Sequence, residues 1–117
     1  MAKKILVIDD EFDDLNATKV ILEKENFDVE TATNGAQAID LLRSHKFDMV
    51  LLDIKMPTLS GYDLLRILRE RLNHKVKMIY ISIVPKQDVD MEDIDGFIQK
   101  PFSPKSLMEG INKVFKK

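Results

Sequence analysis

The stretch ILVIDD, residues 5–10, is a run of four apolar residues that ends in two adjacent aspartates. The same pattern returns in MVLLD, residues 49–53, and in MIYIS, residues 78–82, where a carboxylate and a hydroxyl end the run. Short, nearly continuous apolar runs are typical of parallel strands that are covered by helices on both faces. Because ligands bind at the carboxyl ends of such strands, the sequence predicts an α/β fold with a functional site where these runs end.

Segments with helical periodicity alternate with these strands from one end of the chain to the other. The expected helices between strands lie at about residues 13–25, 36–44 and 62–72. The two further expected strands lie at about residues 27–33 and 96–99. A last helix is expected to begin with Ser103 as its N-cap and Pro104 at its first position, a strong start signal.

The segment Ile83–Asp95 interrupts this alternation. It contains Pro85 and a group of acidic residues, while Val89, Met91 and Ile94 give it little apolar face. We therefore expect a loop, or at most one irregular turn, where a doubly wound fold normally carries a helix.

The composition narrows the functional classes. The 117 residues carry a net charge of −2, and their basic residues are scattered, unlike those of a nucleic-acid-binding protein. The absence of cysteine excludes disulfides, thiolate catalysis and cysteine-based zinc sites. No apolar stretch approaches the length of a membrane span, so we expect a single cytoplasmic domain that binds neither membrane nor nucleic acid.

Asp9 and Asp10 are candidate metal ligands. Adjacent residues of a regular strand point to opposite faces, but at the strand end the chain turns, so both carboxylates can face the same crevice. Clustered carboxylates repel one another unless a cation compensates them, and all-oxygen ligands favour Mg²⁺ or Mn²⁺. The alternative is a pair of solvated loop aspartates, which becomes less plausible once Asp53 and Lys100 are added.

Asp53 is the candidate for covalent modification. A carboxylate beside a metal can attack phosphorus and form an acyl phosphate. Such a transfer depends mainly on neutralising the charge of the phosphoryl oxygens, which Lys100 and the Ser82 hydroxyl can help to do. Alternatively, Ser82 bonds its own backbone and Lys100 is an ordinary exposed lysine. A cis bond between Lys100 and Pro101 would be one way to aim the amine inward.

Four motifs together resemble the receiver domain of two-component response regulators: ILVIDDE at 5–11, LLDIKMP at 51–57, Gly61, and KPF at 100–102. The resemblance covers the whole chain, residues 1–117, as one receiver domain. It implies a flavodoxin-like, doubly wound sheet of five parallel strands in the order 2-1-3-4-5. In this chain the fourth helix of that fold is expected to be shortened or absent.

The resemblance also implies a function. Asp53 would accept a phosphoryl group from a sensor histidine kinase, a phosphotransfer protein or a small donor such as acetyl phosphate. Asp10 would be the main metal carboxylate, Asp9 would assist it, and the backbone carbonyl of Lys55 would complete the protein ligands. The domain would then be a self-modifying phosphoacceptor that controls a partner or an output domain, and not an enzyme with a diffusing product.

The same resemblance assigns a switch to Ser82 and Phe97. The hydroxyl would move toward the phosphoryl oxygen, and the aromatic ring would rotate into the space left behind, as in a two-state element biased by a local charge. The alternative for Phe97 is an ordinary core aromatic on an edge strand.

Three departures from the family pattern affect these expectations. The segment between Ser82 and Lys100 is shorter than usual, which puts output through the fourth-helix region in doubt. Ile83 replaces a small residue and is expected to restrict access to the site or the movement of the serine. Lys55 and Val84 occupy positions that tune phosphoryl lifetime, and neither can orient a water, so we expect slow self-dephosphorylation.

Two other functions compete with this interpretation. One is a phosphorylation-independent interaction module with the same fold, which the shortened segment and Ile83 would favour. The other is a Mg²⁺-dependent phosphatase with an aspartate nucleophile, but Lys55 stands where such enzymes need a second acid. The four glycines form no cluster, so a nucleotide or flavin phosphate loop is absent.

Overall fold

The computed structural model describes residues 2–54, 61–71, 76–92 and 94–116, with the backbone alone at 61 and 62. The strands are β1 (Lys4–Ile8), β2 (Asp28–Ala32), β3 (Met49–Asp53), β4 (Lys77–Ser82) and β5 (Gly96–Gln99). The helices are α1 (Phe12–Lys24), α2 (Gly35–Ser44), α3 (Gly61–Arg71) and α4 (Pro104–Phe115), with a 3-10 helix η1 (Lys86–Asp88) between β4 and β5. For most of these elements, the first and last residues predicted from the sequence lie within about one residue of the observed ones.

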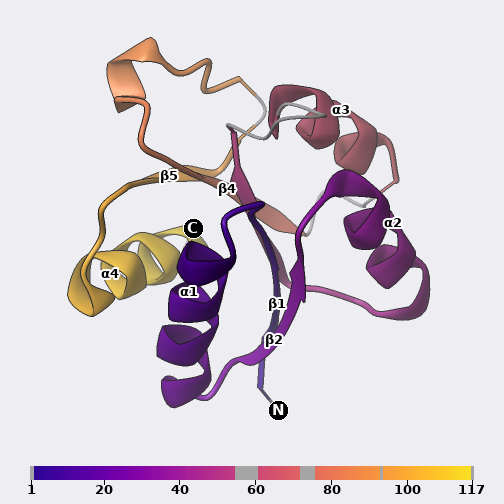
Figure 1. Cartoon of the computed structure of the whole chain (residues 1–117), viewed down its shortest axis with the longest axis horizontal. Coiled ribbons are helices and arrows are strands. Elements are labelled where there is room, and N and C mark those ends of the chain that lie inside the picture. Colours follow the sequence, from indigo (N-terminus) through magenta and orange to yellow (C-terminus); the bar gives the residue numbers. More distant parts are fainter. Residues whose placement is uncertain (1, 55–60, 72–75, 93, 117) are drawn as a thin grey trace.

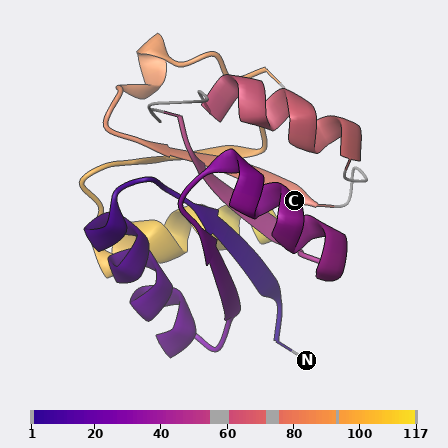
Figure 2. The ribbon, with the colours of Figure 1, turned by 45° about the vertical axis from the view of Figure 1, so that its right-hand side comes forward.

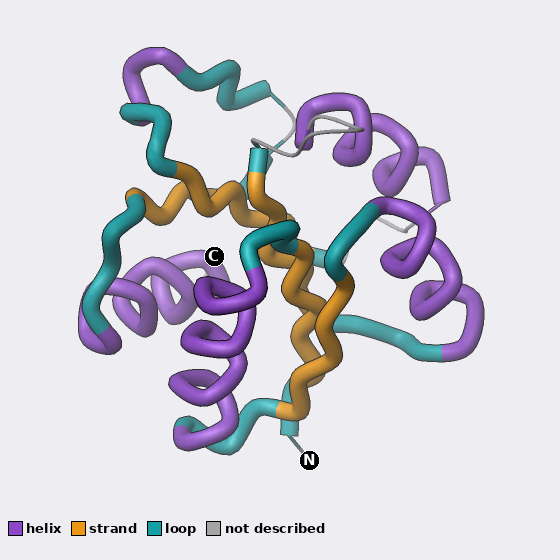
Figure 3. The backbone as a smooth tube through the Cα atoms, viewed as in Figure 1, coloured by secondary structure: helices purple, strands orange, loops and turns teal. Residues whose placement is uncertain are grey.

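The five strands form one parallel sheet in the order β2-β1-β3-β4-β5. Helices α1 and α4 cover one face of the sheet, and α2 and α3 cover the other (Figures 1 and 2). The tube drawing shows the strands enclosed between these two layers (Figure 3). The predicted flavodoxin-like, doubly wound fold is therefore confirmed. Among the described residues, no helix combines the length and the apolar content needed to cross a membrane.

Alternation along the strands divides the apolar side chains between two cores. Leu6 and Ile8 of β1 belong to the core beneath α2 and α3. Ile5 and Val7 face the opposite way, toward α1 and α4. All four side chains are at most 2% exposed, which explains why the run contains no polar residue before its end. The two cores hold the sheet in place, so the strand ends form a rigid platform.

The segment between β4 and β5 contains no α-helix in the part that the structure describes. It loops out from the sheet (orange in Figure 1), and η1 is its one regular turn, as the sequence predicted. It nevertheless packs more apolar side chain than its sequence suggests. Val89 is buried, and Met91 and Ile94 pack against the core on the α2 and α3 side. The loop therefore covers part of the surface that a helix would cover.

An ion pair fastens the end of this segment to the rest of the molecule. The Asp95 carboxylate lies 3.0 Å from Nη2 of Arg69 in α3 and accepts a 2.8 Å hydrogen bond from the backbone N–H of Met78 in β4. The backbone N–H of Asp95 donates to the Met78 carbonyl at 2.8 Å. Asp95 thus joins α3, β4 and the start of β5 at one point.

Close packing and a cap fix the position of α4. Ser103 accepts from the backbone N–H of Ser106 and completes a capping box, as expected for this start of a helix. A Cβ atom added at Gly96 would lie 2.6 Å from Cγ2 of Val114, so α4 approaches β5 where the strand has no side chain. The Lys100–Pro101 peptide bond between these elements is cis.

Replacing Asp95 by alanine is expected to lower the free energy of unfolding by about 1–3 kcal/mol. The substitution removes the ion pair with Arg69 and leaves the buried N–H of Met78 without this acceptor. Urea denaturation followed by circular dichroism measures the effect. The matched control is Asp88→Ala in the exposed 3-10 helix, which should change stability by less than about 0.5 kcal/mol. Equal effects of the two substitutions would show that the Asp95 anchor contributes nothing special.

Candidate functional site

Three carboxylates meet where β1 and β3 end. Asp9 and Asp10 follow β1, Asp53 is the last residue of β3, and each offers an oxygen within 4.8 Å of the others. Asp9 is 4% exposed and Asp53 is 7% exposed, whereas Asp10 is open to solvent. The structure therefore brings together the three acids that the sequence singled out.

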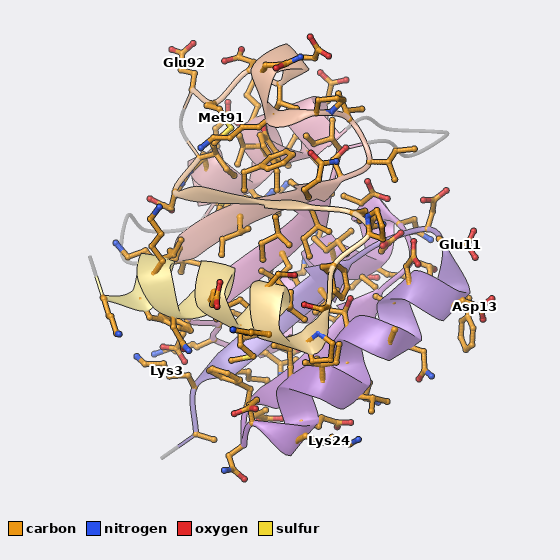
Figure 4. The ribbon with its side chains drawn as sticks, turned by 90° about the vertical axis from the view of Figure 1, so that its left-hand side faces the viewer. Lys3, Glu11, Asp13, Lys24, Met91 and Glu92 are labelled. Atoms are coloured by element: carbon orange, nitrogen blue, oxygen red, sulfur yellow. The ribbon has the colours of Figure 1, made fainter. Side chains whose placement is uncertain are left out.

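The Asp9 carboxylate is held on both sides. Oδ1 of Asp9 accepts a 2.9 Å hydrogen bond from the backbone N–H of Glu11. The backbone N–H of Asp9 donates to the Ala32 carbonyl at 3.1 Å. These bonds form where the chain leaves β1 and turns into α1. Figure 4 shows Glu11 and Asp13 at this end of α1, with Lys24 at the other end of the helix. The turn thus fixes the carboxylate before any ligand binds.

Lys100 reaches into the acidic cluster from the end of β5. Its Nζ lies 2.7 Å from Oδ2 of Asp9 and 3.6 Å from Oδ2 of Asp53, and the lysine side chain is only 9% exposed. Burial by itself lowers the pKa of this ammonium, but the hydrogen bond to Asp9 and the charges of Asp53 and Asp9 outweigh it. The pKa of Lys100 is therefore raised above its ordinary value, and the group is a cation at neutral pH.

Sequence reasoning missed one partner of this lysine. Asp14, in the first turn of α1, places Oδ2 3.1 Å from Nζ of Lys100 and accepts a hydrogen bond from it. The available signal was an acidic residue one helical turn after Asp10, at the start of the helix that leaves the site. Such residues are common at helix starts for general electrostatic reasons, which is why this one did not stand out.

Ser82 ends β4 beside the cluster and is fully buried. Its Oγ accepts a 3.0 Å hydrogen bond from the backbone N–H of Val84, so the hydroxyl does bond its own strand end. That bond uses a lone pair of the oxygen and leaves the O–H hydrogen to be donated. The local backbone bond and a donor role toward a ligand are therefore compatible.

The other residues predicted to belong to the site differ in how far they are buried. Lys55 falls outside the described residues. Phe97 is partly buried and packs against the core on the α2 and α3 side, paired with Tyr80 across β5 and β4. Ile83, expected to restrict the site, is 61% exposed, whereas the neighbouring Val84 is partly buried.

The charges at this edge of the sheet fit a divalent cation. Among the described residues, Lys100 is the one ammonium in contact with Asp9 and Asp53, so the three carboxylates of the cluster carry more negative charge than it neutralises. The donors are all carboxylate oxygens, which Mg²⁺ prefers, and the exposure of Asp10 leaves one side open to water. Asp9, Asp10 and Asp53 are the described residues that would hold the ion.

A flavodoxin-like sheet with an acidic triad and a buried lysine at its carboxyl edge defines a phosphoacceptor class of signalling domain. The family model of the response regulator receiver domain matches residues 5–112 of this chain. The chain therefore belongs to the receiver domains of two-component response regulators, which are phosphoacceptor switches.

Several known proteins are similar to this chain. The response regulator SaeR of Staphylococcus aureus (strain USA300) is 33% identical over 115 residues, covering 94% of this chain and 49% of SaeR. The chain thus spans about half the length of the curated relatives it matches.

Two solved receiver structures resemble this chain in both fold and sequence. A CheY-like receiver domain protein from Methanospirillum hungatei JF-1 has a TM-score of 0.81 at 30% identity, over 99% of this chain and 96% of that one. TrrA from Thermotoga maritima, in complex with Mg²⁺ and BeF, has a TM-score of 0.85 at 31% identity, over 96% and 98%.

Replacing Lys100 by methionine is expected to tighten Mg²⁺ binding by about threefold or more. The substitution removes a positive charge that lies within 3.6 Å of two of the carboxylates and repels a second cation there. Isothermal titration with MgCl₂ measures the dissociation constant. The control is Lys105→Met in the first turn of α4, an exposed lysine that should leave the constant unchanged. A weaker or unaltered Mg²⁺ affinity in Lys100→Met would contradict the assignment of the site.

Proposed function

We propose that this domain accepts a phosphoryl group on Asp53 from a sensor histidine kinase, a phosphotransfer protein or acetyl phosphate. The observation that carries the proposal is the buried Asp53 carboxylate, 3.6 Å from the Lys100 ammonium and within one acidic cluster with Asp9 and Asp10. The proposed nucleophile, the compensating cation and the proposed metal ligands of a phosphoryl transfer would thus act side by side.

In the proposed reaction an Asp53 oxygen forms a new bond to phosphorus. The bond from phosphorus to the acetate oxygen, or to the histidine nitrogen of the donor, breaks, and the leaving group keeps the electron pair. The product is an acyl phosphate on Asp53. Negative charge on the transferred oxygens is met by the Lys100 ammonium, which its raised pKa keeps protonated at neutral pH. The domain would catalyse this modification of itself and its slow reversal.

Mg²⁺ is the proposed cofactor, and Mn²⁺ would fit the same ligands. When bound, the ion supplies a further positive charge to the phosphoryl oxygens. Asp10 would be its main carboxylate ligand, with Asp9 and Asp53 beside it and the backbone carbonyl of Lys55 as a fourth protein ligand. The acidic cluster supports the three carboxylates.

Phosphorylation would then change the conformation of the strand ends. The Ser82 hydroxyl would donate its hydrogen to a phosphoryl oxygen, and Phe97 would rotate toward the space that the serine leaves. The bond from the Val84 N–H to Oγ of Ser82 supports this role, because in it the oxygen accepts and the hydroxyl hydrogen takes no part. A downstream target or output domain would read the change. The net charge of −2 supports the proposal that this domain does not itself bind nucleic acid.

Incubation with acetyl phosphate is expected to add one phosphoryl group to the protein, only with Mg²⁺ present and not in Asp53→Asn. Intact-mass spectrometry detects the adduct directly. The amide removes the attacking carboxylate but keeps the size of the side chain. The matched control is Asp40→Asn, an exposed aspartate in α2, which should be modified like the original protein. A folded protein without adduct, from acetyl phosphate or from a promiscuous kinase, would favour the phosphorylation-independent interaction module instead.

The aspartyl phosphate is expected to last for minutes and not seconds at room temperature. Lys55 and Val84 offer neither an amide nor a carboxylate to orient a water for attack on phosphorus. Val84→Glu should shorten the lifetime, whereas Val20→Glu on the exposed side of α1 should not. Decay of the adduct after removal of the donor measures the lifetime. A half-life of seconds in the original protein would contradict the expectation.

A further inference from the structure

The Gln99 side chain makes contacts that the proposed chemistry does not use. Its Nε2 lies 3.0 Å from the Ser82 carbonyl oxygen, 3.1 Å from that of Ile83 and 3.1 Å from that of Lys100. The two N–H groups of this amide are therefore shared among three carbonyls that belong to the ends of β4 and β5. The amide lies at the last residue of β5, directly opposite Ser82 in the strand register.

The carbonyl groups around the Gln99 side chain require a hydrogen-bond donor at this place. All three neighbouring groups are carbonyl oxygens, which only accept hydrogen bonds, so the nitrogen and not the oxygen of the side chain must face them. The Ser82 carbonyl also accepts the Lys100 backbone N–H at 2.8 Å, which occupies its second lone pair. Gln99 is exposed, so its amide could form its hydrogen bonds with water. In the structure the amide instead donates to backbone carbonyls.

We propose that Gln99 is a positioning residue, whose amide fixes the distance between the Ser82 hydroxyl and the Lys100 ammonium for contact with a phosphoryl group. This inference rests on the proposed function of the site. Ser82 and Lys100 come from different strands, and their side chains must converge on the same phosphoryl oxygens. The amide joins the carbonyls of both residues, and it also holds Ile83, the first residue of the segment that leaves β4.

The backbone supports of the two buried carboxylates do not involve Gln99. Asp9 is held by Glu11 and Ala32, and Asp53 is set by its place in β3, none of which the Gln99 amide contacts. Loss of the amide donors should therefore affect the phosphoryl contacts and leave the metal ligands in place. A residue with a merely structural role would change both, together with the stability of the fold.

Three variants test the proposal. Gln99→Met keeps the length of the side chain and removes its donors, and Gln99→Glu sets a carboxylate against the three carbonyl oxygens. Gln87→Met, in the exposed η1 turn, is the matched control. The measurements are the affinity for Mg²⁺, the affinity for beryllofluoride in saturating Mg²⁺, the rate of modification by acetyl phosphate, and the midpoint of thermal unfolding.

We expect Gln99→Met to weaken beryllofluoride binding and to slow modification by about three- to tenfold, the loss that corresponds to one hydrogen bond. Gln99→Glu should do so more strongly. Both should bind Mg²⁺ at least as tightly as the original protein, because a displaced Lys100 ammonium repels the ion less. Both should unfold at a similar temperature, and Gln87→Met should match the original protein throughout. This split between metal and phosphoryl binding is the signature of a positioning role.

The negative outcomes are distinct. An original protein that neither binds beryllofluoride nor reacts with acetyl phosphate would overturn the proposed function, and the inference with it. If the original protein responds but Gln99→Met behaves like Gln87→Met, the positioning role alone is overturned. Equal losses of Mg²⁺ and beryllofluoride binding in Gln99→Met, accompanied by lower stability, would also overturn it and show a structural contact instead.

Discussion

The contact of the Lys100 ammonium with the buried carboxylates is the interaction on which the rest of the site depends. Asp9 and Asp53 are both less than a tenth exposed, and two such anions side by side would repel each other strongly in a protein interior. The lysine lies 2.7 Å from one and 3.6 Å from the other, and it also binds Asp14. One side chain thereby ties together the ends of β1, β3 and β5 and the first turn of α1.

This arrangement follows from the topology of the sheet. Parallel strands end at the same edge, so the polar residues that close β1, β3 and β4 meet there, although they are far apart in the sequence. The strand interiors can be wholly apolar because helices cover both faces. The same feature that makes the core stable therefore concentrates charged side chains at one edge, and their excess of negative charge suits that edge to a divalent cation.

Much of this was accessible from the sequence, because apolar runs and caps report local structure directly. The cap at Ser103 and the cluster of Asp9, Asp10 and Asp53 were predicted from the residues, and the strand order from the resemblance to receiver domains. A shortened or absent helix between β4 and β5 was also predicted, and the described part of that segment contains no α-helix. Asp14 and Gln99 were not. Their roles arise from contacts with Lys100 and with backbone carbonyls across the sheet, and neither residue type nor spacing encodes such contacts. The burial of Val89 was missed because a single apolar residue in a loop has no periodicity to detect.

The segment between β4 and β5 is held in place although its described part contains no α-helix. A helix would fix this region by packing along its length, whereas here the two ends are held by side chains. At the first end Gln99 donates to the carbonyls of Ser82 and Ile83, and at the second Asp95 binds Arg69 and the Met78 N–H. Between them, Val89 alone is buried among the described residues of the loop. In the proposed reaction, a shift of Ser82 would change the contacts of Gln99 at the first end, while the contacts of Asp95 at the second end would stay in place. Any movement of the segment would therefore begin at Ile83, beside Ser82, and not at Asp95.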